Sequence, residues 1–213
     1  LRLADRRAFH RRVQMIFQDP YGSLNPQHTI GEIVARPLLY QGMKRGAGMR
    51  ARVVASLEQA GLSPVEQYLE KFPHQISGGQ RQRVCIARTL VLEPEILVAD
   101  EPISMLDVSI KWGIIRLLRR LVRDRGISLV YITHDLATVG AVCDRLAIMY
   151  LGRIVEIGPT AEVMATPLHP YTAALVSAIP SPVPGAARPA PDIRGAIPDA
   201  TALPVGCRFA PRC

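Results

Sequence analysis

The sequence lacks a membrane-spanning stretch and has few aromatic residues. Its longest uncharged run, residues 163–187, carries prolines at positions 167, 170, 180, 182 and 184. Prolines at that density break the helix of about 20 apolar residues that a bilayer requires. Aromatic residues make up 5% of the chain and do not alternate with its arginines, so we expect no nucleic-acid partner despite a formal net charge of +8. An anionic membrane surface or a phosphorylated ligand remains compatible with that charge.

Cysteine is also scarce. Cys85 and Cys143 lie far from each other and from the last two, Cys207 and Cys213. This spacing predicts no disulfide framework and is typical of a protein from a reducing cytosol. We interpret Cys85 and Cys143 as structural, because Cys85 falls within an expected helix and Cys143 at the end of one. Cys207 and Cys213 are either ordinary thiols or ligands for a metal.

Apolar patterning predicts alternating strands and helices in a chain that is 48% hydrophobic. This alternation favours an α/β fold with a largely parallel sheet. From Pro180 onward, proline, glycine and alanine dominate, so we expect a tail with little regular structure. The expected strands are 12–17, 95–100 and 127–134, the first and third of them buried; the expected helices are 29–40, 49–60, 77–92, 107–125 and 136–142, followed by a hairpin that turns at Gly152.

Polar residues follow the expected strands, at the edge where parallel sheets bind ligands. In one interpretation the two neighbouring acids have different roles. Asp100 holds a hydrated Mg²⁺, and Glu101 orients and deprotonates a water molecule. His134 would polarise a terminal phosphate, and Gln18 would contact the metal or the water. The alternative is that the two acids merely begin a helix before Pro102 and that the other two are ordinary polar strand ends.

A third candidate is the segment Ser77-Gly78-Gly79, which stands directly before helix-forming residues. A helix start leaves backbone N–H groups unpaired and carries partial positive charge. Glycines let an anion approach the backbone, and the serine adds a hydroxyl donor, so the segment is suited to bind phosphate. An ordinary capped helix start is the alternative.

Taken in order, these segments resemble the ATP-binding subunits of ABC transporters over about Val13 to Pro180. "MIFQDP" is similar to the Q-loop, "ISGGQRQR" to the signature loop, "ILVADEP" to the Walker B strand, "SMLDVS" to the D-loop and "YITHD" to the switch-histidine loop. "FQDPYGSLNP", "HPYTAALVSAIP" and "GCRFAPRC" further resemble the ATPase subunits of bacterial dipeptide and oligopeptide importers, a subfamily that also serves nickel and other small ligands.

The resemblance implies a P-loop NTPase-type nucleotide-binding domain at residues 1–165, with a helical subdomain at about 20–93. A proline-rich C-terminal extension typical of oligopeptide importers would occupy residues 166–213. The implied activity is ATP hydrolysis with Mg²⁺, coupled to import of peptides or related ligands. The implied partners are a second ATPase subunit, identical or paralogous, two membrane permease subunits and, indirectly, an extracytoplasmic binding protein. The protein would be peripheral, on the cytoplasmic face of the cell membrane.

The resemblance also assigns roles to residues. Two such domains pair head to tail, and Ser77 to Gln80 (including Gly78 and Gly79) reach the nucleotide of the opposite subunit. Asp107 crosses the dimer interface. Gln18 reports nucleotide state to a permease helix that docks near Tyr21–Pro26. Arg81 and Arg83 are expected to pack and form salt bridges.

The largest departure from the family is the absence of a G-x-x-x-x-G-K-S/T phosphate loop. The family places that loop upstream of the Q-loop strand, and this chain starts at Leu1 rather than Met, so we expect N-terminal truncation. Ile76 conservatively replaces the leucine of the signature, and Ile103 and Met105 are tolerable departures at positions where the family commonly has threonine and alanine. Some subfamily members hold an iron–sulfur cluster through further cysteines. Such clusters usually take four thiolates, so Cys207 and Cys213 would be two of the ligands in the full-length protein.

Two other functions remain open. One is a soluble ABC-type ATPase that acts on nucleic acid or ribosomes, although the coiled-coil insertions or duplicated domains of such proteins are missing here. The other is a catalytically passive partner subunit, against which Glu101 and His134 argue. The sequence identifies neither the transported ligand nor the partner ATPase.

Overall fold

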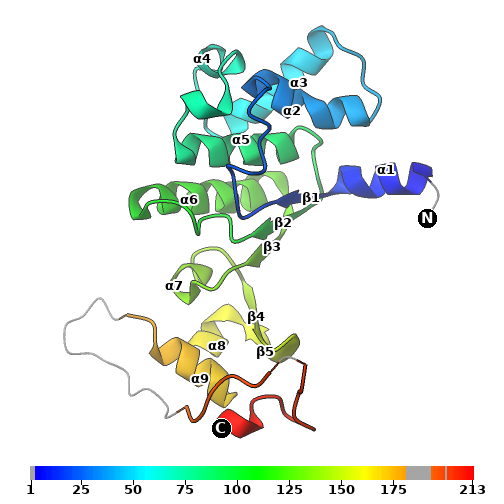
Figure 1. Cartoon of the computed structure of the whole chain (residues 1–213). Helices are drawn as coiled ribbons and strands as arrows, with labels where there is room; N and C mark the ends of the chain where they lie inside the picture. The colour runs from blue at the N-terminus through cyan, green and yellow to red at the C-terminus, as the bar shows by residue number, and fades with distance from the viewer. Residues whose placement is uncertain (1–2, 181–192, 200) are drawn as a thin grey trace. The chain divides into compact units, whose positions relative to one another are not determined.

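A computed structural model describes residues 3–180, 193–199 and 201–213 of the chain (Figure 1). These residues form two compact units, Leu1–His134 and Asp135–Cys213. In the part of the chain that is described, no helix is both long enough and apolar enough to cross a membrane. The predicted boundary at residue 165, between the nucleotide-binding domain and the C-terminal extension, stays a prediction.

The first unit is built on a three-stranded parallel sheet of order β1-β2-β3. Parallel neighbours need crossover connections, and here helices provide them, which confirms the predicted α/β class. The strands are β1 (Val13–Ile16), β2 (Ile96–Asp100) and β3 (Ser128–Ile132). An unpredicted helix, α1 (Leu3–Arg12), precedes β1, and α6 (Val108–Arg125) joins β2 to β3. The connection from β1 to β2 consists of α2 (Ile30–Tyr40), α3 (Ala47–Gln59), α4 (Glu66–Leu69), the 3-10 turn η1 (Pro73–Gln75) and α5 (Gly78–Leu90).

The helix boundaries follow from local capping. α2 and α5 begin at Thr29 and Ser77, and each cap exchanges hydrogen bonds with the third residue of its helix, Glu32 or Gln80. Such a reciprocal pair satisfies two of the backbone N–H groups that a helix start leaves open. Gly126 ends α6 in the left-handed conformation, at φ 64°, which glycine adopts without steric cost.

The sheet has one covered and one open face. Ile16, Leu97 and Ala99 are fully buried on the side where α5 packs against β1 and α6. Met15, Val98 and Val130 are aligned across the three strands and point to the other face, and the exposed fractions of Met15 and Val130 are 36% and 51%. The prediction of buried first and third strands is therefore wrong for one face, because the helices of this unit cover only the opposite one.

The second unit contains the predicted hairpin. β4 (Arg145–Tyr150) pairs antiparallel with β5 (Arg153–Pro159), and Gly152 turns between them at φ 75°. Its core is formed by Val139, Leu146, Ile148 and Val163. The other elements are α7 (Leu136–Val139), the helices α8 (Thr160–Ala165) and α9 (Pro170–Ser177), both missed by the sequence analysis, and the 3-10 turn η2 (Ala210–Arg212).

The C-terminal residues are anchored rather than free. Phe209 is 2% exposed, and its ring lies 5.3 Å from that of Tyr150 and 5.5 Å from that of Tyr171. The expectation of a tail with little regular structure is confirmed for residues 193–199 and 201–209, but the buried aromatic ring fixes its last part to the hairpin and to α9. Most of the predicted tail that precedes it, residues 181–192, lies outside the described residues.

Candidate functional site

The predicted site residues converge on Glu101, directly after β2. One oxygen of its carboxylate accepts a hydrogen bond from the Gln18 amide (2.9 Å), and the other lies 2.9 Å from Nδ1 of His134. Gln18 and His134 follow β1 and β3, so three neighbouring strand ends supply the three side chains. The prediction that these groups lie together at the carboxyl edge of the sheet is confirmed.

The backbone of Glu101 is held in an uncommon conformation. Its φ is 43°, in the left-handed region, which costs a residue other than glycine on the order of 1–3 kcal/mol. Its N–H donates to the carbonyl of Ile132 (2.9 Å), and its own carbonyl accepts from the N–H and the hydroxyl of Ser104 (3.1 and 3.0 Å). These bonds hold the strained residue so that its carboxylate faces Gln18 and His134.

The hydrogen bonds fix the roles of the groups. An ionised carboxylate only accepts, so Nδ1 of His134 carries a proton, and Nε2 is left for another partner. The exposed fraction of the His134 side chain is 72%, whereas that of Glu101 is 24%. A carboxylate has about four acceptor positions, so Glu101 can still accept a bond from water while it holds both neighbours.

Asp100 and Gln18 are the predicted metal ligands. Asp100 is the last residue of β2 and is half-buried. Gln18 uses its amide nitrogen on Glu101, which leaves the amide oxygen for a cation. Mg²⁺ is commonly held by one or two protein oxygens together with phosphate oxygens and waters. One carboxylate and one amide oxygen therefore suit a Mg²⁺ ion that is bound jointly with a phosphate.

The start of α5 presents Ser77 and Gly78 outward but not Gly79. The Ser77 hydroxyl oxygen accepts from the N–H of Gln80 (3.3 Å), and the Gln80 side chain accepts from the N–H of Ser77 (2.9 Å), so the hydroxyl proton of Ser77 is still available to an anion. Gly79 is buried, and a Cβ there would lie 2.6 Å from Cγ2 of Ile110 on α6. The structure therefore gives Gly79 a packing role in addition to the predicted phosphate contact.

This packing role gives a testable prediction. In the full-length protein, Gly79→Ala should lower the free energy of unfolding, because the new methyl group overpacks the α5–α6 contact at a cost of about 1–3 kcal/mol. Ile110→Ala removes the obstructing methyl group, so adding Gly79→Ala in that background should cost less. Urea denaturation of the four proteins measures both effects. Equal costs in the two backgrounds would show that Ile110 is not the obstacle.

The remaining predicted residues of this unit are Asp107, Arg81 and Arg83, and they differ in whether their side chains make hydrogen bonds. Asp107 stands before α6, is exposed and makes no side-chain capping bond, as suits a residue for an interface. Arg81 donates to the carbonyl of Pro73 and Arg83 to that of Ala60, each at 2.7 Å. The prediction that these two arginines pack is confirmed, but through hydrogen bonds to carbonyls rather than salt bridges.

The predicted iron–sulfur ligands gain no support. Cys207 and Cys213 are exposed free thiols, and no cluster of at least three metal-ligating side chains includes them in the described part of the chain. Two thiolates are half of the usual ligand set of such a cluster.

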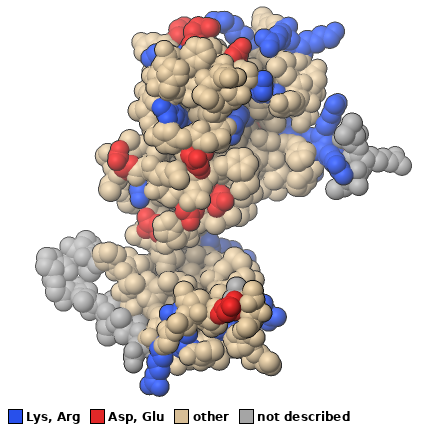
Figure 2. All heavy atoms as spheres, in the orientation of Figure 1, with Lys and Arg blue, Asp and Glu red and all other residues tan. Residues whose placement is uncertain are grey.

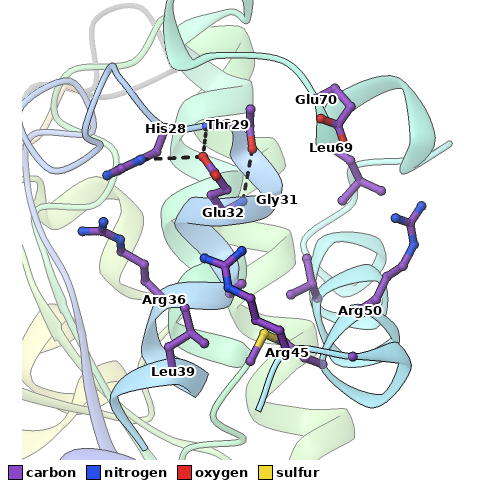
Figure 3. Close-up of a pocket in the computed structure, with 14 residues that line it drawn as sticks. His28, Thr29, Gly31, Glu32, Arg36, Leu39, Arg45, Arg50, Leu69 and Glu70 are labelled. Carbon is purple, nitrogen blue, oxygen red and sulfur yellow. Dashed lines mark hydrogen bonds and ion pairs between the residues drawn. The ribbon is translucent and has the colours of Figure 1, made fainter. Parts of the chain in front are cut away.

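A cavity of about 460 Å³ lies between α2, α3 and α4 (Figure 3). Its lining combines apolar side chains with charged ones, and Figure 2 shows basic side chains gathered over this end of the unit. The N–H of Thr29 donates to Glu32 and holds the pKa of that carboxyl below its ordinary value, so Glu32 is charged. The apolar lining includes Leu39, Met49, Val53 and Leu69, and the guanidinium groups are those of Arg36, Arg45 and Arg50.

Comparison with known proteins agrees with this geometry. Residues 1–104 match the model of the ABC transporter family, and residues 155–213 match that of the oligopeptide/dipeptide transporter C-terminal region. The chain is 49% identical to a putative peptide import ATP-binding protein of Brucella ovis (95% of this chain, 63% of that protein) and 47% identical to the oligopeptide transport ATP-binding protein OppF of Escherichia coli K12 (97% and 62%). It thus spans less than two thirds of the length of these relatives.

Solved structures complete the comparison. The fold is similar to that of the ATP-binding cassette MJ0796 in a dimeric post-hydrolysis state bound to ADP and Pi, with a TM-score of 0.64 and 31% identity over 75% of this chain and 68% of that one. It is also similar to cbiO1 of Clostridium perfringens, part of the ABC transporter complex cbiONQ, with a TM-score of 0.66 and 31% identity over 75% of this chain and 61% of that one. With these motifs in this arrangement, the chain belongs to the ABC transporter family of ATP-binding cassettes.

Proposed function

We propose that these residues are the larger part of an ATP-hydrolysing subunit that energises an ABC importer for peptides or related small ligands. The observation that carries the proposal is the Glu101 carboxylate, oriented by Gln18 and His134 at the edge of the sheet. The names of the relatives, peptide import and oligopeptide transport ATP-binding proteins, support the ligand class. The missing phosphate loop would belong to the part of the relatives that this chain does not span.

In the proposed mechanism, Glu101 orients the attacking water and accepts its proton, a step typically worth 10²–10⁴ in rate. Asp100 and the amide oxygen of Gln18 would hold Mg²⁺, which neutralises phosphate charge when bound. The Nε2 of His134 remains available for the terminal phosphate. Ser77 and Gly78 would serve the nucleotide of a second cassette, because they lie at a solvent-accessible helix start.

We further propose that the cavity between α2 and α3 receives a cytoplasmic segment of the membrane subunit. The side chains of Arg36, Arg45 and Arg50 are in no hydrogen bond or salt bridge with another described residue, and they line the cavity together with apolar side chains (Figure 3). A helix with apolar residues and one carboxylate would fit this lining. The permease helix is predicted to dock near Tyr21–Pro26, and the first residue that lines the cavity is His28, two positions after that segment.

This function implies a set of partners and a location. The subunit would pair with a second ATPase subunit and bind two permease subunits, and an extracytoplasmic binding protein would act through those. It would lie on the cytoplasmic face of the cell membrane as a peripheral protein.

Reconstitution tests the proposal. The full-length subunit, its membrane subunits and the binding protein are placed in liposomes, and ATP hydrolysis and uptake of a labelled pentapeptide are measured. We expect peptide to stimulate hydrolysis and to accumulate inside. Stimulation by DNA or ribosomes instead would favour the soluble ABC-type ATPase. Normal transport by a complex in which only this subunit carries Glu101→Gln would favour a passive partner subunit.

A further inference from the structure

The segment that follows β1 lies along α5. The Asp19 carboxylate accepts from the N–H of Tyr21 (2.7 Å) and closes a turn. Beyond it, the Ser23 carbonyl accepts from Arg88 (2.5 Å), and the Ser23 hydroxyl lies 3.2 Å from the sulfur of Cys85. Arg88 and Cys85 both belong to α5. Two elements that the sequence places about 60 residues apart are thus joined side by side.

Tyr21 extends the contact between this segment and α5 to the start of that helix. The guanidinium carbon of Arg81 lies over its ring, 4.3 Å from the centroid, and Arg81 also donates to the carbonyl of Pro73. The hydroxyl of Tyr21 is 3.0 Å from the position that a Cβ on Gly78 would take. The ring is 54% exposed, so its burial in the core does not explain the contact.

A continuous path of contacts therefore joins two parts of the site. Glu101 bonds to Gln18, and Gln18 directly precedes the Asp19 turn. The turn places Tyr21 against Arg81 and Gly78, at the phosphate-binding mouth of α5. A displacement of Gln18 would move the ring that supports this mouth, because only two residues separate them.

We propose that Tyr21 is a positioning residue that couples the Glu101 site to the start of α5. Its ring would hold Arg81 and Gly78 in the geometry that the nucleotide of the opposite cassette requires. This role rests on the proposed function, which assigns Ser77 and Gly78 to the nucleotide bound by the opposite cassette. The chemical requirement is an aromatic face for the guanidinium group; the hydroxyl only limits the space at Gly78.

A mutant cycle tests the coupling in the full-length subunit with a non-hydrolysable ATP analogue, so that Glu101 and its bond to Gln18 stay intact. The variants are Tyr21→Leu, Arg81→Gln and their combination, with Tyr21→Phe as the matched control that keeps the ring. We expect Tyr21→Leu and Arg81→Gln each to weaken ATP-dependent dimerisation about fivefold, as befits a partly exposed cation–π contact. The double variant should be no weaker than either single one, and Tyr21→Phe should stay within about twofold of the parent.

The readouts separate positioning from folding. Sedimentation measures dimerisation, titration measures ATP affinity of the monomer, and thermal melting reports folding. ATP affinity should not change, since the path serves the opposite nucleotide. Additive losses in the double variant, or unchanged dimerisation by Tyr21→Leu, would overturn the proposal. A parent that fails to dimerise with the analogue would instead remove the proposed function itself.

A rescue experiment tests the contact with Gly78 independently. Gly78→Ala should weaken dimerisation, because the added methyl group meets the Tyr21 hydroxyl at 3.0 Å. Without that hydroxyl the nearest ring atom is 3.9 Å away, an ordinary contact. Tyr21→Phe should therefore restore part of the loss. An equal loss in both backgrounds would show that the ring does not act on this glycine.

Discussion

Glu101→Gln in the full-length subunit is expected to slow ATP hydrolysis by at least about 100-fold, the lower range for loss of a general base. The amide keeps the shape of the side chain but cannot accept the proton of the water. It also presents an NH₂ donor where Gln18 and His134 both donate, so either one of the two 2.9 Å contacts is lost or His134 changes tautomer and accepts at Nδ1. Nucleotide should still bind, and an ATP-bound dimer should accumulate.

The measurement is steady-state phosphate release together with sedimentation in Mg-ATP. Glu95→Gln is a suitable control, because Glu95 precedes the same strand and its carboxylate pairs with Arg12, at the opposite end of β2 from Glu101. It should leave hydrolysis within about twofold of the parent. Near-normal turnover by Glu101→Gln would show that another group activates the water.

The convergence of Gln18, Glu101 and His134 could be predicted because parallel strands end at one edge, and each of the three residues follows an apolar strand. The starts of α2 and α5 could be predicted for a similar reason, since Thr29 and Ser77 are strong caps. In both cases a local pattern determines the structure. Such patterns are visible in the sequence alone.

Features that depend on distant neighbours could not be predicted. The left-handed backbone of Glu101 depends on hydrogen bonds to Ile132 and Ser104, and the residue type at position 101 does not predict it. The packing role of Gly79 requires knowledge that Ile110 lies opposite. The buried position of Phe209 depends on Tyr150 and Tyr171, which come from other elements, so composition alone suggested only an unstructured tail.

The open face of the sheet could not be predicted either, because it too depends on which distant segments pack against the strands. Apolar runs at β1 and β3 indicated strands buried on both sides, but periodicity does not say which segment covers each face. In the structure Met15, Phe17, Val130 and Ile132 stay between 36% and 51% exposed. This apolar surface determines how the 213 residues should behave on their own.

Residues 1–213 expressed alone are expected to bind Mg-ATP weakly or not at all, to hydrolyse none and to associate. No G-x-x-x-x-G-K-S/T loop is present to neutralise the triphosphate, and Asp100 and Glu101 would repel it unless Mg²⁺ bridges them. The exposed sheet face favours self-association, as do the outer edges of β1 and β3, with which no other described strand pairs. Isothermal titration and light scattering measure binding and size, with the full-length subunit as the positive control. Micromolar binding by a monodisperse 213-residue chain would show that the nucleotide site is complete within these residues and lies elsewhere than proposed.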